Sequence, residues 1–219
     1  VHVDAEKRVR PGGDPTTVHY AVVRDGDNVV ICAMWRDDAT CDTRGVHGDH
    51  NRDRGGDRRR DVSAEFSIQV PAGVRLNSNT VNGDLTVEHI TSNVRAGTVN
   101  GTVRVTQVSG DVRARTVNGN VNIDTRSGTA SGETVNGSIE ATIGSGGTGD
   151  IRFRSVNGDI TINAPSSLNA DVDLNVMNGS IDSKYPLNFD RRKKHADGTI
   201  GSGGRQLSAT TVNGSIKLR

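Results

Sequence analysis

The chain has 219 residues, a formal net charge of +1 and only 3% aromatic residues. The balance of 27 Lys and Arg against 26 Asp and Glu gives no bulk charge with which to attract nucleic acid. We therefore expect no specific nucleic-acid partner. No stretch approaches the roughly 18 apolar residues of a membrane-spanning helix, so we also expect no transmembrane segment.

Residues 1–79 show no repeat and are predicted to form an N-terminal β leader. Residues 18–23 and 28–35 read as strands with Asp-Gly between them, which predicts a β-hairpin. Residues 65–70, EFSIQV, alternate apolar and polar positions and predict a further strand. We expect this strand to cap the open end of the domain that follows, because an uncovered end exposes unpaired backbone groups.

The two cysteines, Cys32 and Cys41, are predicted to form a disulfide, which is the simplest fate of such a pair in an exported protein. A pair of free thiols and half of a metal site are the alternatives. Val1 stands first rather than Met, which fits removal of a secretory signal and fits trimming equally well.

The polar segment 37–61 holds weak candidates for a cation site in His47, Asp49, His50 and Asp53. Asp49, Asn51 and Asp53 imitate the start of a calcium loop. However, glycine falls at Gly55, one residue late, and arginine stands where the closing Glu belongs. Interleaved arginines also neutralise the acids. We therefore expect a solvated, internally ion-paired loop and no bound metal.

From residue 80 the tripeptide Val-Asn-Gly recurs every 18 residues, and it returns at wider intervals further along. A fixed period of this kind is typical of a β-solenoid, in which each repeat stacks on its neighbours. The predicted turn residues are Asn82 and Gly83, Asn100 and Gly101, Asn118 and Gly119, Asn136 and Gly137, Asn157 and Gly158, Asn178 and Gly179, Asn213 and Gly214. Stacked asparagines can also hydrogen-bond as a ladder.

Counted from the Val of each Val-Asn-Gly, the fifth and seventh positions are apolar and their neighbours are polar. This alternation predicts strands with one face exposed to solvent. Val103 and Val105, and Val121 and Ile123, are examples. An antiparallel hairpin at each Asn-Gly is the alternative. We predict an all-β fold, a single-stranded parallel β-helix over residues 80–219 with 18–21 residues per coil, and right-handed because parallel crossovers take that hand.

The later repeats contain insertions that carry no recognisable catalytic motif. Residues 184–198 include the basic run 191–194, which fits a solvated loop tip or a contact with phosphate or another polyanion. The two Gly-Ser-Gly-Gly segments lack the Lys and Ser/Thr of a phosphate-cradling loop. We therefore expect no enzyme activity and no cofactor.

Outward positions of the coil halves that lack Asn-Gly carry arginines, whereas the Asn-Gly halves carry acids. The predicted cationic face comprises Arg95, Arg113, Arg115, Arg152 and Arg154. Ordinary solubility explains mixed charges equally well. The functional reading is lateral contact between molecules or contact with an anionic cell-surface polymer.

Residues 212–219 read as a strand of the last coil, and we expect Val212, Ile216 and Leu218 to form a bare edge. Such an edge is a template for another strand. Docking of this edge on the leader of the next molecule would build a head-to-tail fibre. In the competing interpretation, Lys217 and Arg219 protect the edge and the protein stays monomeric.

The segments FSIQVPAGVRL, the repeated TVNG and GSGGRQLSATTVNGSIKL resemble a bacterial adhesin-labelled family of β-solenoid domains of unknown function. The resemblance covers residues 65–219 well and residues 1–79 loosely. It implies a parallel β-helix at the cell surface or outside the cell, with no catalytic residues to carry over. We expect a non-catalytic scaffold for adhesion or fibre assembly; the alternatives are a monomeric envelope-associated ligand-binding or stress-response module and a polysaccharide-degrading enzyme.

Overall fold

The computed structural model describes residues 1–35, 38–48 and 62–219, and it divides into two compact units, Val1–Gln69 and Val70–Arg219. Apart from the 3-10 turn η1 (Pro15–Thr17), the regular structure of the described residues consists of strands, which confirms the all-β class. Strand β7 (Leu76–Asn79) already pairs with a solenoid strand, so the predicted boundary after residue 79 was placed too late.

Unit 1, residues 1–69, is built from antiparallel pairs. Its strands are β1 (His2–Val9), β2 (His19–Asp25), β3 (Asn28–Met34), β4 (Thr40–Asp42), β5 (Gly45–His47) and β6 (Val62–Gln69). They pair as β1 with β6, β2 with β3, and β4 with β5. The predicted hairpin is confirmed: Asp25 pairs with Asn28, and Gly26 takes a φ of +57°, which a tight turn needs and glycine tolerates.

Few side chains hold unit 1 together. Among its described residues the buried apolar side chains are Val18, Cys32 and Val62. The ring of Tyr20 meets Phe66 edge-on at 5.3 Å. A disulfide joins Cys32 in β3 to Cys41 in β4, as predicted from the spacing. The capping role of the leader stays a prediction.

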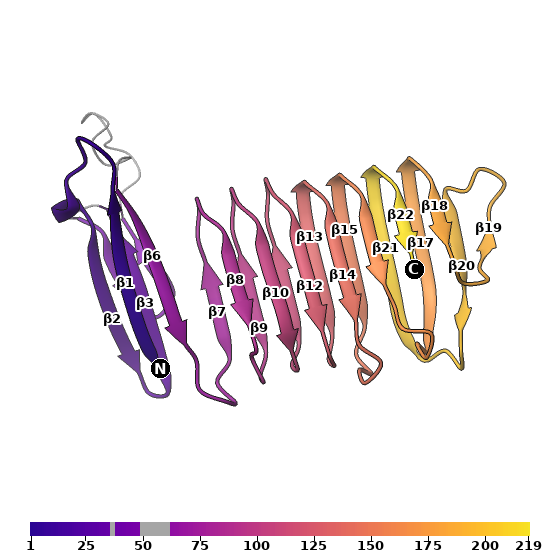
Figure 1. Ribbon diagram of the computed structural model, residues 1–219, viewed down its shortest axis with the longest axis horizontal. Coiled ribbons are helices and arrows are strands. Elements are labelled where there is room, and N and C mark those ends of the chain that lie inside the picture. Colours follow the sequence, from indigo (N-terminus) through magenta and orange to yellow (C-terminus); the bar gives the residue numbers. More distant parts are fainter. Residues whose placement is uncertain (36–37, 49–61) are drawn as a thin grey trace. The chain divides into compact units, whose positions relative to one another are not determined.

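Unit 2, residues 70–219, consists of two mainly parallel sheets (Figure 1). In spatial order the seven-stranded sheet contains β18 (Ile181–Ser183), β22 (Ile216–Leu218), β16 (Ile160–Asn163), β14 (Ile139–Ile143), β12 (Val121–Thr125), β10 (Val103–Val108) and β8 (Leu85–Glu88). The nine-stranded sheet contains β19 (Asn188–Phe189), β20 (His195–Ile200), β17 (Ala170–Asn178), β21 (Arg205–Asn213), β15 (Ile151–Asn157), β13 (Ala130–Asn136), β11 (Val112–Arg115), β9 (Val94–Gly97) and β7.

Each coil contributes one strand to each sheet, and neighbouring coils are in register. Val103 pairs with Leu85 on one side and with Val121 on the other, each a shift of one 18-residue repeat. These pairs are parallel, so the antiparallel alternative at each Asn-Gly is wrong. The parallel β-solenoid is confirmed, whereas its handedness stays a prediction.

The core lies between the two sheets and follows the predicted alternation. Val103, Val121 and Ile139 are almost completely buried, and the buried apolar residues of both sheets form one continuous cluster. Burial of each such side chain contributes about 1.5–3 kcal/mol. A coil alone buries little, so the stack of coils stabilises itself cooperatively.

Glycine is needed at the Asn-Gly corners because neighbouring coils approach closely there. Gly101 has a φ of +150°, and a Cβ at this position would lie 2.2 Å from the carbonyl oxygen of Gly83 in the coil before it. The hydroxyl of Thr98 donates to that same carbonyl at 3.0 Å. A larger residue would both strain the backbone and push the coils apart.

The asparagines of the corners form the predicted ladder. From the second member on, each Nδ2 donates to the Oδ1 of the asparagine before it in the stack, at 2.7–2.9 Å. In spatial order the ladder runs through Asn82, Asn100, Asn118, Asn136, Asn157, Asn213 and Asn178. Its order departs from the chain order at Asn213.

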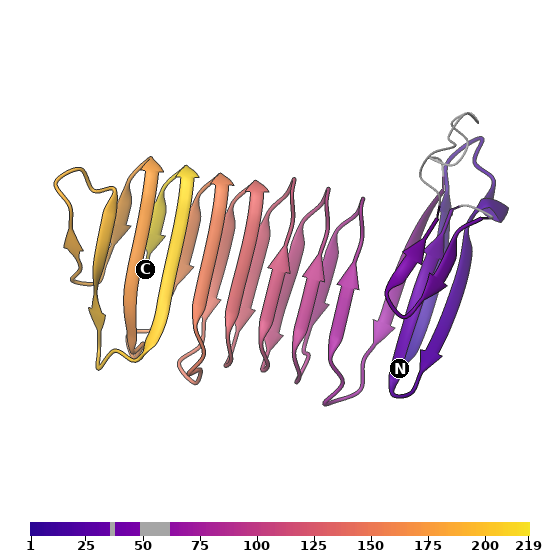
Figure 2. The ribbon, with the colours of Figure 1, turned by 180° about the vertical axis from the view of Figure 1, so that it is seen from behind.

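Residues 205–219, which comprise β21 and β22 and are called the inserted coil below, lie inside the solenoid (Figures 1 and 2). β21 lies between β15 and β17, and β22 lies between β16 and β18. Ile216 and Leu218 have no exposed surface, and Val212 is half-buried. The predicted bare edge at Val212, Ile216 and Leu218 is therefore wrong.

The wide interval between Met177 and Val212 is the physical reason. Coil β17–β18 stands two strand positions from coil β15–β16, and the chain then returns through β20, which pairs antiparallel with the far edge of β17. The position left between the two coils is filled by residues 205–219.

Candidate functional site

The five predicted arginines share the outward face of the nine-stranded sheet, called the arginine face below. Arg95 pairs with Arg113, and Ser131 separates Arg113 from Arg152. In the parallel row, Glu133 separates Arg115 from Arg154. All five side chains are exposed because they alternate with the buried residues of the same strands.

Glu133 neutralises part of this face. Its carboxylate lies 3.1 Å from Arg115 and 3.7 Å from Arg113. Arg95, Arg152 and Arg154 have no ion pair with an acid in the described part of the chain. Three guanidinium groups thus remain available to an external anion. The 18-residue period placed Glu133 one coil above Arg115, so this pairing was open to prediction and was missed.

The far end of the same sheet is acidic. Asp171 and Asp173 on β17 and Asp197 on β20 face outward, and His195 lies between acids, 3.3 Å from Asp197. The other nitrogen of His195 contacts Asn175 at 2.9 Å. The repeat pattern does not predict this cluster, because the cluster depends on the antiparallel return of β20, which follows no repeat.

On the strands of the nine-stranded sheet, the arginines of β9, β11 and β15 thus lie apart from the acids of β17 and β20, while the turn between β19 and β20 carries the basic run 191–194. This differs from the expectation of one cationic and one acidic face. One outward row of the seven-stranded sheet mixes both signs, with Arg104, Glu140, Lys217 and Asp182.

A row of exposed apolar side chains borders the arginine face. It lies two residues after the row that holds Arg115 and Arg154. Its members are Val81, Val99, Val117, Val135, Val156 and Met177, with exposed fractions from 39% to 68%. A ligand on this face would meet cationic and apolar side chains together.

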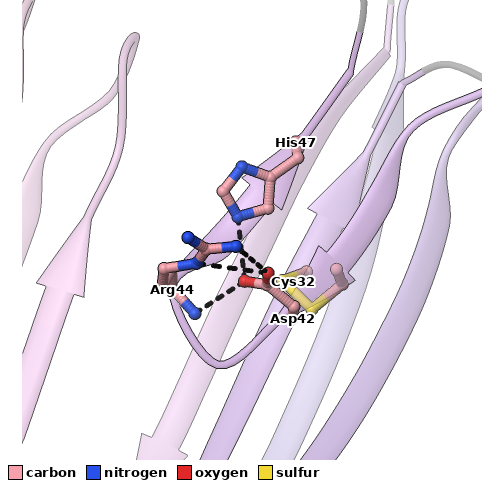
Figure 3. Close-up of polar contacts among 5 residues, drawn as sticks. Cys32, Asp42, Arg44 and His47 are labelled. Carbon is pink, nitrogen blue, oxygen red and sulfur yellow. Dashed lines mark hydrogen bonds and ion pairs between the residues drawn. A yellow bond between two sulfur atoms is a disulfide. The ribbon is translucent and has the colours of Figure 1, made fainter.

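A second polar cluster lies in the β4–β5 hairpin of unit 1 (Figure 3). Asp42 accepts hydrogen bonds from the backbone N–H of Arg44 at 2.7 Å and lies 2.8 Å from Nε2 of His47. The Arg44 N–H first, and then His47 and the Arg44 guanidinium, lower the pKa of Asp42 to about 2. These groups satisfy one another within the hairpin, next to the disulfide at Cys41.

Of the weak metal candidates, the structure places His47 against Asp42, while Asp49, His50 and Asp53 lie outside the described residues. Within residues 1–35, 38–48 and 62–219, no three His, Cys, Asp or Glu side chains gather closely enough to hold a metal ion. Over the same residues, no helix has the length and apolarity to cross a membrane.

Residues 60–219, which include β6 and all of unit 2, match the Toastrack DUF4097 family. The chain belongs to the Toastrack family. Toastrack DUF4097 is a domain of unknown function, so the match supports the β-solenoid but assigns no activity to the arginine face. The match shows no adhesin-specific family. Neither a curated protein nor a solved structure matches this Toastrack chain.

Proposed function

We propose that this Toastrack chain is a non-catalytic scaffold at the cell surface and that its arginine face binds an anionic polymer. The observation that carries the proposal is the set of arginines at fixed strand positions on one rigid sheet, three of them without an acid partner among the described residues. Adhesion to such a polymer is the activity that we assign to the scaffold.

The spacing of the arginines suits an extended ligand. Neighbouring strands lie about 4.8 Å apart, so charges one and two strands apart repeat at about 5 and 10 Å along the solenoid. Arg95, Arg113 and Arg152 occupy one such row. A polymer lying along the row could contact several guanidinium groups, each of which can bind a carboxylate or phosphate through two N–H groups.

The disulfide supports a location outside the cytoplasm, since such bonds persist in oxidising compartments. Head-to-tail docking through Val212, Ile216 and Leu218 lost its support when these residues were found inside the solenoid. The alternative, a monomeric envelope-associated ligand-binding or stress-response module, would recognise its ligand through the leader and the loops.

Binding to inorganic polyphosphate and to polygalacturonate, each measured by titration at two salt concentrations, tests the proposal. The triple variant Arg95→Gln, Arg152→Gln, Arg154→Gln is expected to weaken binding at least tenfold, about 1.4 kcal/mol. The matched control removes three cations elsewhere: Arg24→Gln, Arg104→Gln and Lys217→Gln. Equal weakening by both triple variants, or no binding by the unmodified protein, would overturn the proposal.

A further inference from the structure

The inserted coil is bound on both sides by parts of the chain that precede it. Toward β15 and β16, the N–H of Ile160 donates to Ser215 at 2.9 Å, and the N–H of Arg219 donates to Ile162 at 2.8 Å. Toward β17 and β18, the N–H groups of Gly214 and Ile216 donate to the coil 178–183 at 2.9 and 3.0 Å. Without the inserted coil, two strand edges would face each other with unpaired backbone groups.

Side chains of residues 205–219 fill this position, called the slot below. Leu207, Ala209, Ile216 and Leu218 fill the core with no exposed surface. The amide of Asn213 continues the asparagine ladder between Asn157 and Asn178.

Arg205 anchors the start of the inserted coil. It is 6% exposed and donates to the carbonyl oxygen of Gly147 at 2.8 Å and, more weakly, to that of Gly128 at 3.5 Å. These contacts reach loops that belong to two other coils.

A short hinge, residues 201–204, connects the inserted coil to β20. Three of its residues, Gly201, Gly203 and Gly204, have positive φ angles of 60°, 71° and 113°. Ser202 and Gly204 are held by backbone N–H donation to Asn169 and Asp171. The hinge is therefore a glycine-rich turn that side chains of β17 and the loop before it fix in place.

We propose that the slot is a binding site for residues 205–219 of a second copy of this chain, so that copies join by exchanging the inserted coil. Every hydrogen bond and apolar contact of the coil with the slot can be made by the identical coil of another molecule. Only the hinge distinguishes the two arrangements, and exchange of an identical element is a low-cost route to oligomers. The proposal goes beyond polymer binding and does not depend on the arginine face.

The length of the hinge decides which copy fills the slot. β20 and β21 lie on opposite sides of β17, so the hinge spans two strand spacings, about 9.6 Å. The chain from Ile200 to Arg205 makes five Cα–Cα steps and can reach about 17 Å. Deletion of residues 202–204 leaves two steps, which reach about 7 Å at most. The coil of such a variant cannot fill its own slot while Ile200 and Arg205 both keep their pairing with Ala170.

The hinge-deletion variant of the full chain is the experiment. Light scattering after size exclusion is expected to show dimers or longer assemblies and loss of the monomer peak. A matched variant, with six Gly-Ser residues added after Ser202 instead, is expected to be monomeric because a longer hinge favours the coil of the same chain.

Cross-linking identifies what fills the slot. Met177 and Val212 occupy adjacent strands, since their neighbours Asn178 and Asn213 are paired. Hinge-deleted copies with Met177→Cys, refolded together with hinge-deleted copies with Val212→Cys, are expected to join through a short bismaleimide. Monomeric hinge-deleted protein with a protease-sensitive coil would overturn the proposal, and so would assemblies in which these cysteines do not cross-link.

Discussion

The solenoid buries an unbroken cluster of apolar side chains from Val87 to Leu218, whereas unit 1 buries only Val18, Cys32 and Val62 among its described apolar residues. Parallel strands from successive coils supply the first core. Two hairpins, the antiparallel pair of β1 with β6 and a disulfide supply most of the order in the second. The difference shows two routes to a stable β unit: many coils that share one core, or a cross-link that compensates for a small one.

The comparison predicts that a charge in the shared core has the largest effect. Val121→Asp places a carboxylate at a position with no exposed surface, between Val103 and Ile139, and is expected to cost about 3 kcal/mol or more. Asn122→Asp, on the outward side of the same strand, is the control and should cost little. Urea unfolding followed by circular dichroism measures both. Equal tolerance of the two substitutions would contradict the shared core.

Loss of the disulfide is expected to affect unit 1 alone. Cys41→Ser should lower the free energy of unfolding of unit 1 by roughly 2–3 kcal/mol, since the bond closes a short loop. Trp35 is the single tryptophan and donates its indole N–H to Val62, so its fluorescence reports on unit 1. A parallel loss in the solenoid transition would mean that the two units unfold as one.

The asparagine ladder should make a smaller contribution within the solenoid. Asn118→Ala removes a side chain that donates to Asn100 and accepts from Asn136, and we expect a cost of about 1 kcal/mol. Asn82 ends the ladder and makes only one such bond, so Asn82→Ala should cost about half as much. Urea midpoints of the two variants test this order. An equal loss of stability in the two variants would show that the hydrogen bonds of the ladder contribute nothing beyond the Asn-Gly turns.

The smallest expected effect is on the stability of unit 1 at acidic pH. The pKa of Asp42 is lowered to about 2 in the folded protein, below the ordinary value of about 4, so its carboxylate stabilises unit 1 above pH 4. That stabilisation is lost as the pH falls from about 4 to about 2. Asp42→Asn should flatten this part of the Trp35 acid-unfolding curve, whereas Asp27→Asn at the tip of hairpin β2–β3 is the control. An unchanged curve for Asp42→Asn would show that the hairpin contacts do not stabilise the fold.

Much of the solenoid follows from the sequence because its repeat is local. The alternation at Val121 and Ile123 predicts which side chains face inward, and the Asn-Gly pairs predict the corners and the ladder. The disulfide follows from two cysteines close in the chain. The cluster around His195 could not be predicted, because β20 pairs against the direction of the repeat.

The repeat in the amino-acid sequence is enough to predict the coil: its period, its inward residues and its need for glycine at positions such as Gly101. The order in which the coils stack is visible only in the folded chain. Because every coil carries the same corner and the same alternation, each can pair with any other, and the local pattern does not say which. The longer connection after Met177 leaves one position open, and residues 205–219 fill it because backbone groups on both of its sides need partners.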